Sequence, residues 1–506
     1  MKVLLVRPPY HRLKGYRPAP YFPLGAGYVG AVLEKAGHTV KIWNADATVG
    51  ITAGVMPDEV TMLKDRRKKF EEYLSALQND AHIVWEEVRG VLKDFDPDVV
   101  GFTVLSPEVG SAAKFSAIVK EGRQDRIVVW GGHHATFLPD DVLSYGVADI
   151  VVRGEGERIA VEMMSVLTSG REKLSEVNGI SYRDNDKVRH NPEQEMIEDL
   201  DSIPFPAHHL ALFPESFKRM ERIGIMTNRG CPFRCGYCSS PAFTRKSVRF
   251  RSFENVIEEI RYVTRFYNKN IVSFLDDNFT INKKKVMELC NHLISANLKV
   301  SWDTMTRADI LNEDVVKLLK QAGCCGVSIG IESGSERMIK KIDKGVNLDK
   351  MVDAYSLLYR YDIPSGANFM VGFPEETMED IGKTFDLMKK IKTENINFNI
   401  FEPIPGSPLL EDCIRLGLVP QNVDWRTFGF WPMNYFVKDI PPDEFAKTVF
   451  NIAQWVFDYK CSLRVRWMRI KPYIKNDLLY PFKKLLKSIK VRILKRFINL
   501  DSKTVN

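Results

Sequence analysis

The stretch NRGCPFRCGYCSS, residues 228–240, holds three of the eight cysteines of this 506-residue chain. Cys231, Cys235 and Cys238 follow the spacing C-x₃-C-x₂-C. Cysteines at this density act as metal ligands or redox pairs, because a thiol can lose its proton and the resulting thiolate is a soft metal ligand. Iron–sulfur clusters are normally held by four cysteines. A [4Fe–4S] cluster held by these three would leave one iron open to a substrate or cofactor.

Two other interpretations of the cysteines are kept open. A structural zinc site needs four ligands, and only Cys235 and Cys238 have zinc-like spacing, so His208 or His209 would have to complete a zinc knuckle. Alternatively, the three thiols are reduced core residues. The remaining cysteines are scattered and are not expected to bind the cluster: Cys290, Cys324, Cys325, Cys413 and Cys461.

The sequence around the cysteines predicts a strand-to-helix turn. RIGIMT (222–227) is typical of a buried strand, and FENVIEEIRYVTRFY (253–267) has helical apolar spacing. With Tyr237 before the last cysteine, the stretch resembles the signature of the radical S-adenosylmethionine (SAM) superfamily. The resemblance implies a [4Fe–4S] cluster whose open iron binds SAM. It also implies reductive cleavage of SAM to a 5′-deoxyadenosyl radical, with electrons from a donor such as flavodoxin or ferredoxin.

Composition is that of a globular protein, with 44% hydrophobic and 27% charged residues. No apolar run approaches the roughly 20 residues that span a bilayer, and MKVLLVRPPY at the start does not resemble a signal peptide. Clustered free thiols therefore predict a reducing cytoplasm. The net charge of +7 is concentrated in residues 460–497, so no general nucleic-acid partner is expected.

The N-terminal third alternates apolar runs with helical patterns. Strands are expected at 2–8 and 38–46, with a helix over 24–37 between them. The stretches 96–106, 126–140 and 148–157 repeat the scheme of an apolar β-run, a glycine or polar turn and then a helix, which makes five strands. This alternation predicts an α/β fold with a doubly wound sheet, whose ligands bind at the carboxyl ends of the strands. The glycines at those ends would let a large flat ligand approach the backbone.

GGHHATFLPDDVL (131–143) followed by DIVVRGEGE (149–157) resembles the cobalamin-binding domain that precedes many radical SAM domains. The histidine motif D-x-H-x-x-G is missing, so His11 is not expected to ligate cobalt and cobalamin is expected to bind without a protein histidine. His134 is expected to line the binding edge or to make loop hydrogen bonds. The resemblance implies cobalamin contacts by Leu24, Gly25, Ser106, Gly131, Gly132, His133 and Glu155.

Residues 178–191 predict a β-hairpin, and the proline-containing segment 198–214 predicts a linker. The expected domains are therefore 1–200, 201–410 and 411–506. In the second, six strands alternate with helices between 222 and about 406, which predicts a partial (β/α)₆ barrel with its site at the carboxyl strand ends. The third is expected to be mostly helical.

Four segments of this barrel resemble cobalamin-dependent radical SAM proteins in the same order: DDNFT, GIESGSE, MVGFPEET and PIPGSP. The resemblance implies SAM contacts by Tyr237, Asp276, Asn278, Arg307, Glu332 and Ser333. The alternatives are structural, because Asp276 could cap a helix, Ser333 could act as an N-cap and Arg307 could pair with Asp309.

The family resemblance implies methylation of an unactivated carbon in a small-molecule or lipid substrate. The runner-up activity is anaerobic oxidative cyclisation of a porphyrin side chain, and a cobalamin or redox sensor is the non-enzyme alternative. The tail YPFKKLLKSIKVRILKRF (480–497) predicts a basic amphipathic helix, which favours peripheral contact with an anionic membrane or packing on the barrel or a partner.

Overall fold

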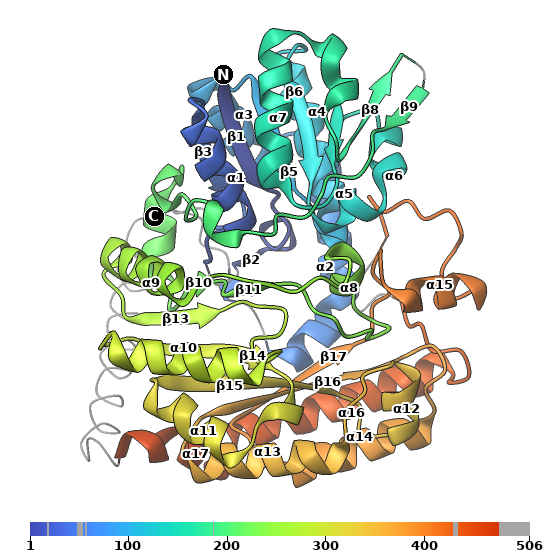
Figure 1. Cartoon of the computed structure of the whole chain (residues 1–506). Helices are drawn as coiled ribbons and strands as arrows, with labels where there is room; N and C mark the ends of the chain where they lie inside the picture. The colour runs from blue at the N-terminus through green and yellow to red at the C-terminus, as the bar shows by residue number, and fades with distance from the viewer. Residues whose placement is uncertain (18–19, 48–53, 56–57, 186, 429–433, 475–506) are drawn as a thin grey trace, which may run out of the picture.

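The computed structural model describes residues 1–17, 20–47, 54–55, 58–185, 187–428 and 434–474 (Figure 1). It contains two α/β units, each built on its own sheet, and a mostly helical C-terminal region. The predicted fold class is thereby confirmed. Among the helices of the described ranges, none combines the length and apolar character that a membrane span requires.

The N-terminal sheet has seven strands in the order β3-β1-β5-β6-β7-β8-β9. The first five pair in parallel, as expected for strands connected through helices. The hairpin predicted at 178–191 forms, but it continues this sheet through an antiparallel contact with β7. The strands are β1 (Lys2–Arg7), β3 (Thr39–Asn44), β5 (Val99–Thr103), β6 (Ile127–Gly131), β7 (Ile150–Val152), β8 (Ile180–Asp184) and β9 (Lys187–His190).

Helices cover both faces of this sheet, because its strands are apolar on both sides. In β1, Val3 and Leu5 belong to the core under α1 (Leu24–Lys35) and α7 (Gly156–Ser169). Leu4 and Val6 belong to the core on the opposite face. That face carries α3 (Ile83–Phe95) and α4 (Val109–Gly122), and the remaining elements of the unit are β2 (Tyr16–Arg17), β4 (Gly54–Val55), α2 (Glu59–Gln78), α5 (His133–Phe137) and α6 (Pro139–Ser144).

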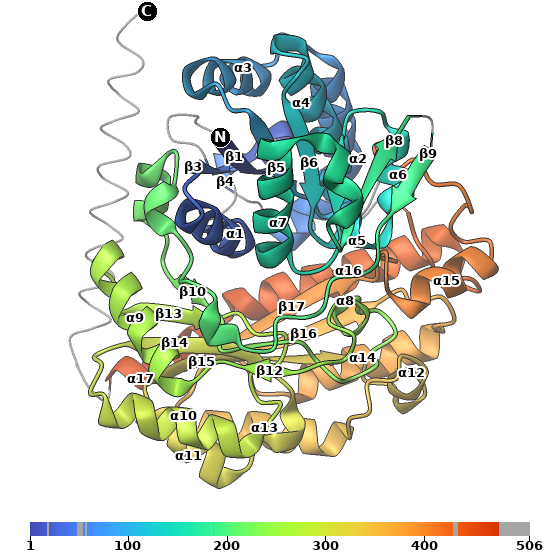
Figure 2. The same cartoon turned by 45° about the horizontal axis from the view of Figure 1, so that its top comes forward.

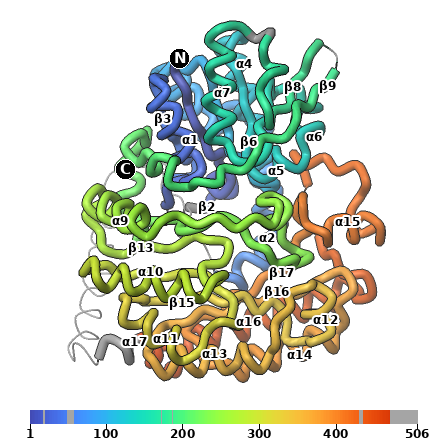
Figure 3. The backbone as a smooth tube through the Cα atoms, viewed as in Figure 1, coloured from blue at the N-terminus to red at the C-terminus, as the bar shows by residue number. Residues whose placement is uncertain are grey.

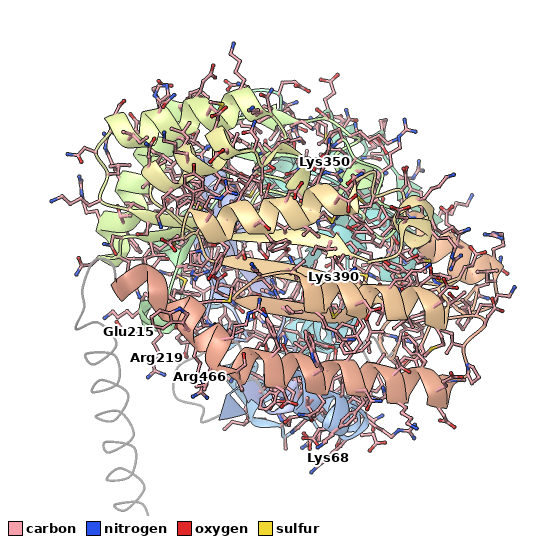
Figure 4. All side chains as sticks on the ribbon, turned by 90° about the horizontal axis from the view of Figure 1, so that it is seen from below. Lys68, Glu215, Arg219, Lys350, Lys390 and Arg466 are labelled. Carbon is pink, nitrogen blue, oxygen red and sulfur yellow. The ribbon has the colours of Figure 1, made fainter. Side chains whose placement is uncertain are left out.

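The second sheet has six parallel strands in sequential order, β10-β13-β14-β15-β16-β17, and β10 and β17 form its two edges. It is the predicted partial barrel. Its strands are β10 (Ile223–Ile225), β13 (Ile271–Phe274), β14 (Ser301–Thr306), β15 (Cys324–Glu332), β16 (Ser365–Val371) and β17 (Asn395–Ile400). The intervening helices are α9 (Phe253–Tyr267), α10 (Lys283–Ser295), α11 (Glu313–Gln321), α12 (Glu336–Lys341), α13 (Leu348–Arg360) and α14 (Met378–Lys390). Seen from below, α13 and α14 carry exposed side chains such as Lys350 and Lys390 on their outer surface (Figure 4).

The C-terminal helices are α15 (Pro408–Arg415), α16 (Pro442–Cys461) and α17 (Leu463–Ile474). Helix α16 packs against both β17 and α2, and thus lies between the barrel and the N-terminal unit (Figure 2). An ion pair between Lys460 and Glu59 fastens α16 to α2. The chain between β9 and β10 connects the two units, and its course can be followed in the tube view (Figure 3). The predicted amphipathic segment 480–497 lies outside the described residues.

Candidate active site

A cavity of about 400 Å³ lies where the carboxyl ends of the N-terminal strands face the beginning of the barrel. Its deep part is apolar and runs between the sheet and helices α1 and α7, with Val3, Leu5, Val99, Val129, Leu33 and Met163 in its wall. Its mouth combines Gly131, Gly132 and Gly154 with the barrel-side residues Asn228, Arg229, Gly230, Ser240 and Asp277. One cavity therefore joins the N-terminal unit to the segment that carries the cysteines.

The shape and chemistry of this cavity fit cobalamin, which has a flat ring with amide arms and a nucleotide tail that ends in an aromatic base. The apolar slot suits the base, and the glycine-lined mouth suits the ring and its amides. Gly132 has φ +93°, and an added Cβ would lie 2.9 Å from the backbone nitrogen of Val104. Position 132 therefore requires glycine, because its backbone conformation disfavours other residues and a side chain would clash with Val104.

The structure places most of the predicted cobalamin-contact residues at this cavity. Its wall includes Gly25, Gly131, Gly132, His133 and Glu155. Leu24 and Ser106 do not line it. Leu24 packs toward Gly224 of β10, and the buried Ser106 hydroxyl contacts Nδ1 of His134 at 3.0 Å. Contact with cobalamin stays a prediction for all seven residues.

Two histidines are positioned by other contacts. Nδ1 of His11 lies 3.1 Å from the carboxylate of Asp46, and His11 is not part of the cavity wall. The ring of His133 stacks on Phe243 at a centroid distance of 4.4 Å, and burial lowers the pKa of His133. Burial therefore favours the neutral form of His133 on the cavity wall. Absence of a histidine ligand to cobalt remains the expectation.

Glu155 has a structural role that the sequence did not reveal. Both carboxylate oxygens accept hydrogen bonds from Arg249, at 2.8 and 3.0 Å, and Arg229 bridges Glu155 and Glu157 at 3.0 and 2.5 Å. Burial opposes ionisation of Glu155, but the hydrogen bonds and charges of Arg249 and Arg229 outweigh it and lower its pKa. We call Glu155, Glu157, Arg229 and Arg249 the interdomain clamp.

The cysteine loop is more elaborate than the predicted strand-to-helix turn. It lies between β11 (Asn228–Arg229) and the short helix α8 (Ser240–Phe243). The chain then forms β12 (Arg249–Phe250), which pairs antiparallel with β11, before α9 begins. Gly230 permits this arrangement, because it has φ +96° and a Cβ there would lie 1.9 Å from the carbonyl oxygen of Ser247. The cysteines therefore lie between the predicted strand and the predicted helix, with β11, α8 and β12 as additional elements between the two.

The three cysteines of the loop are free thiols, and their charges influence one another. Burial is the main reason that the pKa of Cys238 is raised to about 11, and Cys235 and Cys231 add to the effect. Among the described residues, no group of three or more His, Cys, Asp or Glu could hold a single metal ion. A [4Fe–4S] cluster sets a different requirement, because each thiolate binds a different iron of the cluster. Three neighbouring thiols on one loop fit that requirement.

The histidines of the zinc alternative are engaged elsewhere. Nδ1 of His208 contacts the hydroxyl of Tyr267 at 2.9 Å, and Nε2 of His209 lies 2.9 Å from the carboxylate of Glu34. Neither contact involves the cysteine loop. A zinc knuckle completed by either histidine finds no support in these positions.

A buried polar group connects the cysteine loop to the end of β15. The hydroxyl of Tyr237 donates to Oε1 of Glu332 at 3.0 Å, and Nζ of Lys344 donates to both groups at 2.8 and 2.9 Å. Glu332 has φ +69°, which is strained for a residue with a side chain. Lys344 is not among the predicted site residues, because a lysine after a short helix is usually a surface residue.

The other predicted SAM contacts also have structural partners. Asp276 accepts hydrogen bonds from the backbone of Thr227 and Asn228, so it fastens the segment before the cysteine loop instead of capping a helix. Arg307 pairs with Asp309, as the structural alternative proposed, and its guanidinium lies 3.7 Å from the ring centroid of Phe233.

The side-chain oxygen of Asn278 accepts a hydrogen bond from the backbone N–H of Thr280. The hydroxyl oxygens of Ser333 and Thr384 are 3.1 Å apart, within hydrogen-bonding distance. A role in SAM binding stays a prediction for all six residues: Tyr237, Asp276, Asn278, Arg307, Glu332 and Ser333.

Filling the cavity from α1 should weaken cobalamin binding. Gly25 lines the cavity, and an added Cβ there meets no atom within 4 Å. Gly25→Phe is therefore expected to fold normally and to lower the affinity for hydroxocobalamin at least tenfold, measured by absorbance titration. Gly90→Phe on the exposed surface of α3 is the matched control, since its Cβ also meets open space. Equal affinities of the two variants would contradict the placement of the cofactor.

Comparison with known proteins agrees with this geometry. The sequence profile described as "Radical SAM superfamily" matches residues 225–388, and that described as "B12 binding domain" matches residues 13–163. An uncharacterized methyltransferase of Pyrococcus horikoshii is 32% identical over 431 residues, which are 85% of this chain and 86% of the relative. An anaerobic magnesium-protoporphyrin IX monomethyl ester cyclase of Rubrivivax gelatinosus is 28% identical over 438 residues, 85% of this chain and 72% of the relative.

Among solved structures, the radical SAM methyltransferase TsrM of Kitasatospora setae has the same fold, with a TM-score of 0.67 and 17% identity over 89% of this chain and 88% of that one. The cobalamin-dependent SAM radical enzyme OxsB has a TM-score of 0.65 and 18% identity over 98% of this chain and 72% of that one.

Proposed function

This chain belongs to the cobalamin-binding radical SAM enzymes, and from that premise we propose that it methylates an unactivated carbon atom of a small molecule or lipid. The observation that carries the proposal is the shared cavity. Gly131 and His133 from the N-terminal unit and Gly230 and Ser240 from the cysteine segment line the same space. A methyl-carrying cofactor and a radical-generating site would therefore act on one substrate.

When bound, the [4Fe–4S] cluster, SAM and cobalamin supply the radical chemistry and a methyl donor. The protein's own residues bind and orient these groups. Cys231, Cys235 and Cys238 would ligate the cluster and leave one iron position for SAM. Tyr237 ties the loop to Glu332, and the apolar slot keeps water away from the bound cofactor. These residues orient reactants, whereas acid–base side chains cannot activate such a carbon.

The experiment that tests the proposal follows the methyl group. The reconstituted, reduced full-length protein is incubated with cobalamin, deuterated-methyl SAM and a cell extract, and labelled products are sought by mass spectrometry. A product that carries a deuterated methyl group is expected. Release of 5′-deoxyadenosine without any labelled product would contradict methyl transfer and favour a cyclase, the activity named for the Rubrivivax relative.

The reaction also needs a low-potential electron donor, and we infer a flavodoxin or ferredoxin. The cysteine loop supports this proposal, because Arg234 lies exposed between two of the predicted cluster ligands. An anionic donor protein would be attracted to such a positive charge. Reduction of the cluster by photoreduced flavodoxin, followed by electron paramagnetic resonance, is the corresponding test.

We propose further that the protein contacts anionic membranes through residues 480–497. The sequence of this segment contains no acidic residue. In a helix, the spacing would put six apolar side chains on one stripe: Phe482, Leu485, Leu486, Ile489, Ile493 and Phe497. Each basic residue near an anionic surface adds on the order of 1 kcal/mol of binding free energy. The full chain is therefore expected to co-sediment with vesicles that contain phosphatidylserine, whereas a chain ending at residue 474 should not. Equal sedimentation of the two chains would refute the proposal.

A further inference from the structure

The barrel strands expose an unusual inner face. In β15, Val327, Ile329 and Ile331 are buried in the core formed with the helices. The alternate residues Ser328 and Gly330 are only partly buried and lie on the opposite, inner face. The same alternation holds along β13, β14, β16 and β17. The inner face is therefore a second surface of the sheet that the helices do not cover.

This inner face is mostly polar, with Ile271, Met305 and Met370 as its apolar members. Barrel interiors are usually filled by bulky branched side chains. The other members of the inner face include Ser273, Asp303, Ser328, Asn368, Asn395, Asn397 and Asn399, with glycines at 326, 330 and 366. The small residues leave space above the sheet, and the side-chain amides point hydrogen-bonding groups to the same side. Such a composition fits a ligand-binding surface better than a packed core.

Four of these residues form a hydrogen-bonded row that we call the amide ladder: Ser328, Asn368, Asn397 and Asn395. The amide of Asn368 donates to Ser328 Oγ at 3.0 Å, and that of Asn397 donates to Asn368 at 2.8 Å. Asn395 donates to Asn397 at 2.9 Å. Strand pairing supports the row, because Asn368 and Asn397 are direct partners in the register of β16 and β17.

The ladder fixes the amide orientations but does not use their full capacity. An asparagine side chain can donate two hydrogen bonds and accept two. Within the row, Asn368 and Asn397 each use one amide hydrogen, and an oxygen of each accepts one bond. Each amide therefore keeps a donor and an acceptor for another molecule, held in place before that molecule arrives.

The ladder lies on the same sheet that contributes Leu275 to the wall of the cofactor cavity. Leu275 lines that cavity and is half exposed, beyond the end of β13. Met305, also half exposed, follows on β14 and pairs in register with Ser328 of the ladder. Two residues before Met305 on the same face, the carboxylate of Asp303 pairs with Arg222 at 2.9 Å, so this acid is neutralised. The ladder's own side chains are uncharged, and the acid beside them is paired.

We propose that the amide ladder binds an electrically neutral, hydroxyl- or amide-rich part of the methyl acceptor. This inference rests on the proposed methyl transfer and narrows its substrate class from "small molecule or lipid" to a polar small molecule. An acyl chain against the ladder would leave the remaining amide groups without water and without partners, which disfavours lipid substrates.

The test uses the reduced holoenzyme with deuterated-methyl SAM and a cell extract divided into neutral water-soluble, anionic, cationic and lipid fractions. The label is expected in the neutral water-soluble fraction. The double variant Asn368→Leu/Asn397→Leu should lower the initial rate of labelling by that fraction at least tenfold. Asn291→Leu on the exposed surface of α10 is the matched control and should stay within twofold of the parent.

Release of 5′-deoxyadenosine without extract and the melting temperature report whether the double variant is folded, and Asn368→Ser provides a milder change that keeps a polar group. Label in the lipid or a charged fraction, or equal rates of the ladder variant and the parent, would overturn the inference. If the parent with an intact cluster releases no 5′-deoxyadenosine, the proposed function itself fails, and the inference fails with it.

Discussion

Replacing Cys231, Cys235 and Cys238 together by alanine is expected to abolish the [4Fe–4S] cluster and all SAM cleavage. The three thiols lie on one loop between β11 and α8, and each would bind a different iron. Without them the loop offers no soft ligand. Iron and sulfide content, visible absorbance and 5′-deoxyadenosine release after anaerobic reconstitution measure the effect.

Cys461→Ala is the control for the cysteine variant, because this thiol is exposed on the last turn of α16, far along the chain from the loop. It should retain cluster content and activity. Four iron atoms per protein in the triple variant would show that other cysteines hold the cluster and would contradict the ligand assignment.

The second large effect is expected at the interdomain clamp. Glu155→Ala removes the partner of Arg249, whose side chain is only 3% exposed, and one of the two partners of Arg229. Loss of one member of a buried ion pair typically costs about 3–5 kcal/mol, since a charge is left without compensation. The melting temperature should fall by several degrees and proteolysis between the two units should accelerate.

Glu34→Ala is the matched control for the clamp. Glu34 also pairs across the molecule, with His209, but both side chains are nearly half exposed. Exposed pairs contribute about 0–1 kcal/mol, so this variant should melt close to the parent protein. Equal shifts for Glu155→Ala and Glu34→Ala would mean that the clamp does not hold the two units together.

The strands and the order of the domains were predictable because they depend on local patterns. The apolar run 3–6 forms the centre of β1, and residues 253–267 form α9, which the side chain of Ser252 caps. The cysteine spacing is equally local. The spacing alone was enough to predict three cluster ligands on one loop, because this prediction does not depend on tertiary contacts.

The cofactor slot and the clamp were not predictable from the same patterns. Val3 and Leu5 look like ordinary core residues in the sequence, and only the space between the sheet and helices α1 and α7 makes them cavity wall. Gly101 inside β5 was the one available signal, since glycine weakens a strand and often marks a close approach. Glu155 and Arg229 are separated by 74 positions, so their pairing depends on how the two units meet.

The amide ladder was also not predictable from the sequence. Alternation along β16 and β17 was visible in the sequence, yet a half-buried polar face is also what an ordinary exposed sheet shows. Only the sheet order and the register bring Ser328, Asn368 and Asn397 into one row. Chemical specificity is therefore encoded in contacts between strands, which spacing along the chain does not reveal.

The central claim is that this chain uses its cysteine loop and its cobalamin cavity to carry out SAM radical chemistry. Its most direct test is chromatographic quantification of 5′-deoxyadenosine and methionine, after the reduced, anaerobically reconstituted full-length protein has been incubated with SAM and cobalamin. The account predicts that both products accumulate in the parent protein and are absent from the Cys231, Cys235 and Cys238 triple alanine variant. Absence of both products from a parent protein whose cluster is intact and reduced would contradict it.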